Sequence, residues 1–165
     1  MRTILFSFSN EWFQYLNSGK MKFEYRKAFP VEETKVYFYV SRPVMAITGI
    51  AHFGPRESLM DWLNLYGNRS EIIRNRILDY MTDCKYAVKI YDYSQTNRID
   101  LQQLRKDIPG FIPPHMYYYI DETPLLTYLE KRVKPLGMRW KFSFEHIDEN
   151  EICNIMEQGM SEKTR

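Results

Sequence analysis

Short apolar segments with a two-residue period constrain the fold of this chain more than any other feature. Residues 2–8 (RTILFSF), 35–40 (KVYFYV) and 44–53 (VMAITGIAHF) are rich in β-branched and aromatic side chains, so each predicts a strand. Helical patterns lie between these strands without forming regular strand–helix–strand units. The order of elements therefore predicts an α+β fold rather than a doubly wound parallel sheet.

The spacing of apolar residues and the positions of proline and glycine predict further elements. Helices are predicted where apolar residues recur every three to four positions, in residues 11–19, 56–66, 70–82, 100–107 and 121–133. Other strands are expected in residues 20–29 and 85–93. Residues 111–120 (FIPPHMYYYI) are expected to be extended at a sheet edge, because prolines cannot donate to a central ladder. Residues 137–159 predict a strand followed by an acidic helix.

Composition excludes several classes of protein. A chain of 165 residues corresponds to one domain, or to one domain with an appendage, and it can bury a core without metal or disulfides. The net charge is only +2, so any attraction for nucleic acid must come from a local patch. Two cysteines and no apolar run of about 20 residues argue against a secreted disulfide scaffold or a membrane span. We expect a cytoplasmic protein without a membrane partner.

The stretch NSGKMKFEYRK, residues 17–27, contains the most suggestive charge pattern. Strand alternation would place Lys22, Glu24 and Arg26 on one face. The opposite face would then carry Met21, Phe23 and Tyr25 into the core. Such a charged row can accept a hydrogen bond from a base through its carboxylate and donate to phosphate through its cations. The simpler alternative is a surface strand with same-face charge pairs.

This stretch resembles the signature of the ASCH domain family, Gly-x-Lys-x-x-Glu-x-Arg. Gly19, Glu24 and Arg26 match in register, whereas Met21 occupies the lysine position. Residues 35–53 and 99–121 are also similar to parts of the family's longer bacterial and archaeal members. The likeness covers residues 1–121, with 54–83 as an enlarged helical connection, and it predicts residues 122–165 as a C-terminal extension packed on that domain.

The resemblance implies a PUA-like, partly open β-barrel with flanking helices and an inserted helical pair. It also implies a charged cleft that binds RNA or a modified nucleoside. The residues that we expect at this site are Lys20, Lys22, Glu24, Arg26, Ser41, Arg42, Tyr117 and Tyr119.

Some family members resemble amidohydrolases that use a lysine at the motif's third position and a hydroxyl residue at the sixth. Met21 and Glu24 stand there in this chain, and a thioether is neither a base nor a nucleophile. We therefore expect binding rather than turnover. An amidohydrolase acting on an acylated nucleoside, or a protein-interaction module, stays open as an alternative, and a homodimer is possible.

Other candidate sites are weaker. Ser41 and Arg42 stand at a strand break before Pro43, which suits either ligand contact or a plain turn. Tyr117 and Tyr119 could stack on bases, but tyrosines are more often buried in an aromatic-rich core.

The helical pair 56–66 and 70–82 raises the possibility of a DNA-reading helix-turn-helix. Its second helix is broadly apolar, so we expect a flap over the barrel instead. No metal or cofactor is expected, because the candidate ligands are scattered: His52, His115, His146, Cys84 and Cys153.

Overall fold

The structure is a computed structural model, and it describes residues 1–154. Within that range its strands are β1 (Arg2–Phe8), β2 (Phe23–Arg26), β3 (Thr34–Val40), β4 (Ala46–Ser58), β5 (Tyr86–Asp100), β6 (Tyr117–Tyr119) and β7 (Pro135–Lys141). The helices are α1 (Asn10–Asn17), α2 (Leu59–Leu65), α3 (Glu71–Met81), α4 (Leu101–Asp107) and α5 (Pro124–Arg132), and a 3-10 turn, η1, covers Glu149–Glu151.

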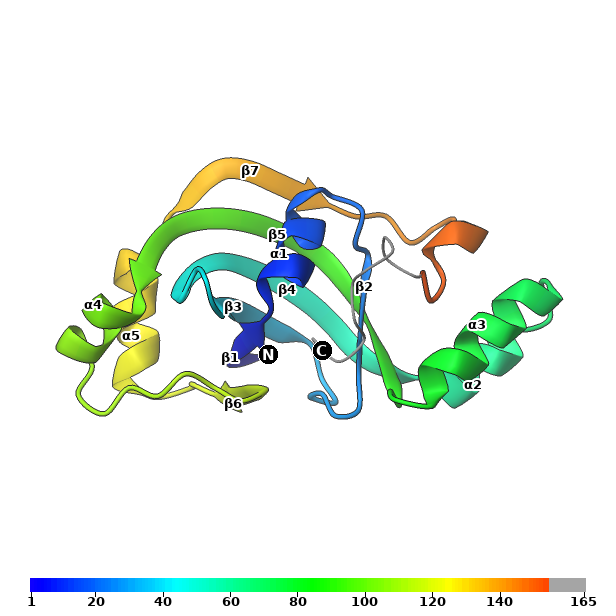
Figure 1. The fold of residues 1–165 in the computed structure, drawn as a ribbon, viewed down its shortest axis with the longest axis horizontal. Coiled ribbons are helices and arrows are strands. Elements are labelled where there is room, and N and C mark those ends of the chain that lie inside the picture. The colour runs from blue at the N-terminus through cyan, green and yellow to red at the C-terminus, as the bar shows by residue number, and fades with distance from the viewer. Residues whose placement is uncertain (155–165) are drawn as a thin grey trace.

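The strands form one mixed sheet that curls into a half-barrel (Figure 1). Six of them run in the order β2–β5–β4–β3–β1–β6, and β7 pairs with β5 beside that path. Strands β1 and β3 are parallel, whereas the other pairs are antiparallel. This architecture confirms the predicted α+β class and the partly open barrel.

Strands β4 and β5 are longer than the sequence pattern predicts. A helix was expected from residue 56, but β4 continues through Gly54 and Pro55 to Ser58. The ladder between β4 and β5 shifts register on either side of Phe53, so bulges absorb the glycine and proline without ending the strand. Helix α2 then begins at Leu59, where the Ser58 side chain accepts from the Met60 amide.

The apolar side chains form three clusters. The first fills the concave side of the sheet and joins α1 to it, with Phe6, Phe8, Trp12, Phe13, Met21, Phe38 and Phe53 among its members. The second packs α4 and α5 on Leu5, Tyr37 and Tyr39. The third joins the α2–α3 pair to β2 through Phe23, Tyr25, Trp62, Ile73 and Ile77. The inserted pair is thus packed on the sheet as a flap.

The chain after residue 121 is built into the same body. Helix α5 contributes Leu125 and Leu129 to the second cluster, and β7 pairs with β5. The strand predicted at the start of residues 137–159 is β7, which begins at Pro135 and ends at Lys141. Of the predicted acidic helix, the described residues contain the single turn η1, and Glu157 lies outside them. The division at residue 121 stays a prediction. No helix within residues 1–154 is long and apolar enough to cross a membrane.

Candidate functional site

Glu24 and Arg26 form an ion pair on β2, two residues apart on one face of the strand. Arg26 Nε donates to Glu24 Oε1 at 2.9 Å, and the exposed fractions of the two side chains are 8% and 0%. The Arg26 guanidinium lies 4.6 Å from the centre of the Phe6 ring and 5.9 Å from that of Phe8. The curl of the sheet thus brings the edge strand β2 against β1 and surrounds the pair with aromatic rings.

The predicted alternation of side chains in the motif is wrong for the residues before Phe23. Met21 packs in the first cluster with Phe6 and Phe8, whereas Phe23 and Tyr25 belong to the third cluster. The reason is local: Gly19 has a φ of 76° after α1, and β2 begins only at Phe23. Because residues 20–22 are not strand, they do not continue its alternation. Met21 therefore fills the core, and Lys22 does not share the face of Glu24.

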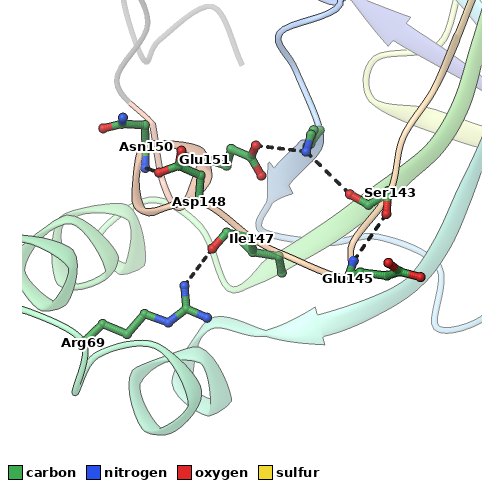
Figure 2. A network of polar contacts seen from close by, with 8 residues as sticks. Arg69, Ser143, Glu145, Ile147, Asp148, Asn150 and Glu151 are labelled. Atoms are coloured by element: carbon green, nitrogen blue, oxygen red, sulfur yellow. Dashed lines mark hydrogen bonds and ion pairs between the residues drawn. The ribbon is translucent and has the colours of Figure 1, made fainter.

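Lys20 and Lys22 lie apart from the buried pair. Lys22 Nζ is 2.9 Å from Glu151 Oε1 and 3.5 Å from the Ser143 carbonyl oxygen (Figure 2). Both lysines line a cavity of about 40 Å³ together with Trp12, Tyr15, Met21, Phe23, Tyr25, Asn150, Glu151 and Asn154. This volume has room for only a few water molecules. The polar cavity beside the motif is therefore separate from the Glu24–Arg26 pair.

Ser41 and Arg42 begin the turn that joins β3 to β4. The Ser41 amide donates to the Phe8 carbonyl at 3.0 Å, and its hydroxyl reaches the same oxygen at 3.4 Å. Ser41 is thus held at the backbone of Phe8, the last residue of β1. Arg42 is exposed and precedes Pro43 through a cis peptide bond.

Tyr117 and Tyr119 stand on the edge strand β6. Tyr117 pairs in register with Phe6, is half-buried, and contacts the ring of Phe29 at 5.8 Å between centroids. Burial raises the pKa of the Tyr117 hydroxyl. Tyr119 is 41% exposed, and the Arg2 guanidinium lies 3.8 Å from its ring centre. Tyr117 therefore lies at the margin of the core, and Tyr119 lies on the surface.

The structure brings together four of the expected site residues along β1. Arg26 lies over the rings of Phe6 and Phe8 and donates to Glu24, Tyr117 pairs in register with Phe6, and Ser41 donates to the Phe8 carbonyl. Lys20 and Lys22 lie elsewhere, whereas Arg42 and Tyr119 lie at the exposed margin.

Sequence reasoning missed the aromatic rings of β1 and one further cation. Phe6 and Phe8 carry no signal beyond that of an ordinary strand. Arg56, which was expected in a helix, lies in β4, where it donates to the Phe29 carbonyl at 2.8 Å and lies 4.1 Å from the Tyr86 ring centre. The part of the chain that the structure describes contains no group of three or more His, Cys, Asp or Glu side chains able to hold a metal.

Comparison with known proteins supports the resemblance. No protein-family model matches the chain. A protein of Zymomonas mobilis subsp. mobilis named as an ASCH domain-containing ribonuclease is 26% identical over 135 residues, which cover 75% of this chain and 89% of that protein. The crystal structure of ASCH from Zymomonas mobilis superposes with a TM-score of 0.59 at 20% identity, covering 81% of this chain and 97% of that one. A tyrosine-to-phenylalanine mutant of the same protein gives the same TM-score at 19% identity, with 81% and 100% covered.

These likenesses agree with the curled mixed sheet, and they cover most of the chain. The chain is thus similar in sequence to an ASCH domain protein and has the PUA-like fold of the ASCH structures.

Proposed function

We propose that this protein binds RNA or a modified nucleoside at the junction of β1, β2 and β6. The observation that carries the proposal is the buried Glu24–Arg26 pair, which is held against Phe6 and Phe8 beside Tyr117. An arginine placed among aromatic rings suits a planar base, because it can stack on the base or donate two parallel hydrogen bonds to it. The named activity of the relative supports RNA as the polymer.

The residues of the proposed site form a buried part and an exposed part. Arg26, oriented by Glu24, is the group that reads a base once the base enters the junction. Tyr119 and Arg42 are exposed, so they contact the rest of the strand without rearrangement. Because a duplex hides its base edges in a deep groove, this division favours single-stranded RNA over double-stranded RNA. Lys20 and Lys22 are assigned to the cavity beside Glu151 and not to this junction.

A direct test compares ligands of increasing size. The protein is titrated with nucleosides, with a labelled single strand of about 15 nucleotides and with the corresponding duplex. Fluorescence anisotropy and thermal shift report binding. We expect the single strand to bind more tightly than the duplex. Equal failure of all ligands, with the protein folded, would contradict the proposal.

RNA cleavage is a second candidate function, and the name of the Zymomonas relative is the observation that favours it. The labelled single strand is incubated with the protein in buffer with and without a chelator, and its length is followed on a gel. Cleavage is assigned to this protein only if it decreases in the Glu24→Gln/Arg26→Met variant purified in the same way. Cleavage that persists in that variant comes from another residue or from a contaminating nuclease.

A further inference from the structure

Six exposed cations gather where α4 and α5 end. They are Arg98, Arg105, Lys106, Lys131, Arg132 and Lys134, and we call this surface the basic end. Among residues 1–154, none of the six lies within 4.0 Å of a carboxylate oxygen, although five other lysine and arginine side chains do form such pairs. The basic end is therefore a local positive charge in a chain whose net charge is only +2.

Specific contacts hold these cations on one surface. The Tyr128 hydroxyl on α5 donates to Asp107 on α4 at 2.6 Å, and the Arg132 guanidinium lies 4.8 Å from the Tyr128 ring centre. The Asn97 side chain at the end of β5 donates to the Arg132 carbonyl at 2.9 Å and accepts from the Lys134 amide at 2.7 Å. The two helices consequently lie side by side at one end of the half-barrel (Figure 1).

The nearby carboxylates stabilise the helices instead of pairing with the cations. Asp100 caps α4 by accepting from the Gln103 amide at 2.8 Å. Asp107 accepts from the Tyr128 hydroxyl and, at 2.6 Å, from the Gln103 side chain. These two hydrogen bonds lower the pKa of Asp107. The acids thus fix the positions of the cations and leave their outer sides accessible to a partner.

The opposite end of the molecule uses its cations differently. There Lys22 pairs with Glu151, and Arg69 donates to the Ile147 carbonyl at 2.8 Å (Figure 2). Arg76 donates to the Glu149 carbonyl at 3.2 Å. These contacts attach the segment 143–151 to the helical pair and to the residues just before β2. At the basic end, Arg98 alone of the six cations donates to a carbonyl of the described chain, that of Val44, so the other five are available to a partner.

We propose that the basic end binds the phosphate backbone of the RNA strand whose base enters the junction at Arg26, an inference that rests on the proposed function. The turn 41–45 connects the two surfaces. Arg98 donates to the Val44 carbonyl at 3.3 Å, and the Ser41 amide donates to Phe8 beside Arg26. The exposed Arg42 lies between them on this turn. A strand following these cations gains affinity by releasing condensed counterions.

Two charge-matched double variants test the proposal. Lys106→Gln/Lys131→Gln removes two cations from the basic end, and Arg74→Gln/Lys85→Gln removes two exposed cations near the helical pair. Binding of the labelled single strand is measured by anisotropy between about 0.05 and 0.3 M salt. We expect the slope of log K against log salt to decrease in magnitude by about 0.7 per lost phosphate contact in the first variant. Affinity at about 0.1 M salt should then fall roughly tenfold or more, with little change in the control.

The outcomes separate this inference from the function on which it rests. If the unmodified protein binds RNA and both double variants weaken it equally, net charge alone is responsible and the basic end is overturned as a site. If neither variant changes the affinity or the slope, it is overturned as well. If the unmodified protein binds no RNA even at the lowest salt, the proposed function fails and this inference fails with it. Melting temperatures close to that of the unmodified protein verify that both variants fold.

Discussion

Arg26 donates to Glu24 across 2.9 Å inside the half-barrel, with less than a tenth of either side chain exposed. Two buried charges lose most of their hydration, and their mutual attraction offsets that loss only while both are present. The pair is therefore sensitive to single substitutions. The same arrangement gives a way to separate an architectural role from a role in binding.

Removal of one partner should destabilise the fold. We expect Arg26→Ala to lower the free energy of unfolding by about 3–5 kcal/mol, because the buried carboxylate of Glu24 would lose the guanidinium that pairs with it. The double variant Glu24→Gln/Arg26→Met removes both charges at similar volume and should unfold close to the unmodified protein. Urea titration measures both. An Arg26→Ala protein of unchanged stability would show that Glu24 finds water or another donor without Arg26.

The double variant is also the decisive test of binding. If Arg26 reads the base, Glu24→Gln/Arg26→Met stays folded and loses affinity for the single strand by roughly ten- to a hundredfold, the loss of a charge-assisted hydrogen bond of about 1.5–3 kcal/mol. Unchanged affinity in the folded double variant would assign the pair to architecture alone.

Tyr119 should matter for binding and little for stability. Its ring is 41% exposed, so Tyr119→Ala is expected to change the unfolding free energy by less than about 0.5 kcal/mol. If a base stacks on the ring, the same substitution costs about 1–3 kcal/mol of binding. Tyr119→Phe keeps the ring and serves as the control. Equal losses in the two variants would indicate that the hydroxyl, and not the ring, makes the contact.

The structure explains why position 19 of the motif is a glycine, which the sequence alone does not reveal. Gly19 has a φ of 76°, and a Cβ there would lie 2.8 Å from ring atoms of Trp140. The Trp140 indole nitrogen donates to the Asn17 carbonyl at 3.0 Å, so the ring is fixed over the end of α1. A side chain at position 19 therefore meets both backbone strain and a ring that cannot move freely.

Gly110 provides a matched control for that argument. Its φ is 81°, but a Cβ there would have no atom within 4 Å. Gly110→Ala should cost about 1–2 kcal/mol of backbone strain, and Gly19→Ala should cost about 1–3 kcal/mol more, because Trp140 must shift. In a Trp140→Ala background the difference should disappear, which thermal denaturation of the four proteins would measure. A persistent difference would place the cost elsewhere than in the ring.

Local sequence patterns predicted much of the fold but less of the candidate site. The alternation in β1 and β3 and the prolines before the edge strand β6 predicted their elements, because each depends on neighbouring residues alone. A glycine within a strand is typical of a bulge or a close backbone approach, and Gly49 in β4 has both: the ladder shifts between Ile47 and Gly49, and a Cβ would lie 3.0 Å from Tyr93.

The errors have a common cause, since each depends on contacts between distant segments. Strand alternation was extended through residues 20–22, where the backbone leaves Gly19 and has not yet entered β2. Lys22 was therefore assigned to the face of Glu24, although its partner Glu151 lies far away in the sequence. Phe6 and Phe8 become neighbours of Arg26 only because the sheet curls. No spacing within the chain encodes that approach.

Tyr93 predicts a pH dependence of stability on the alkaline side. It is fully buried, its hydroxyl donates to the Asn17 side chain, and burial raises its pKa well above that of an exposed tyrosine. Since the folded pKa is the higher one, the contribution to stability is complete below about pH 10, where the unfolded tyrosine is neutral. Above that pH the unfolded state loses a proton that the folded state keeps, and stability declines by about 1.4 kcal/mol per pH unit.

Tyr93→Phe removes this titration together with one hydrogen bond. At pH 8 the variant should be less stable than the unmodified protein by about 1 kcal/mol, the typical net contribution of such a bond. Between about pH 10 and 11 that gap should close or reverse, because the unmodified protein alone carries the additional penalty. Urea titrations of both proteins at several pH values measure the gap. Parallel stability curves would mean that Tyr93 ionises as readily in the folded protein as in the unfolded chain, and that its environment admits water.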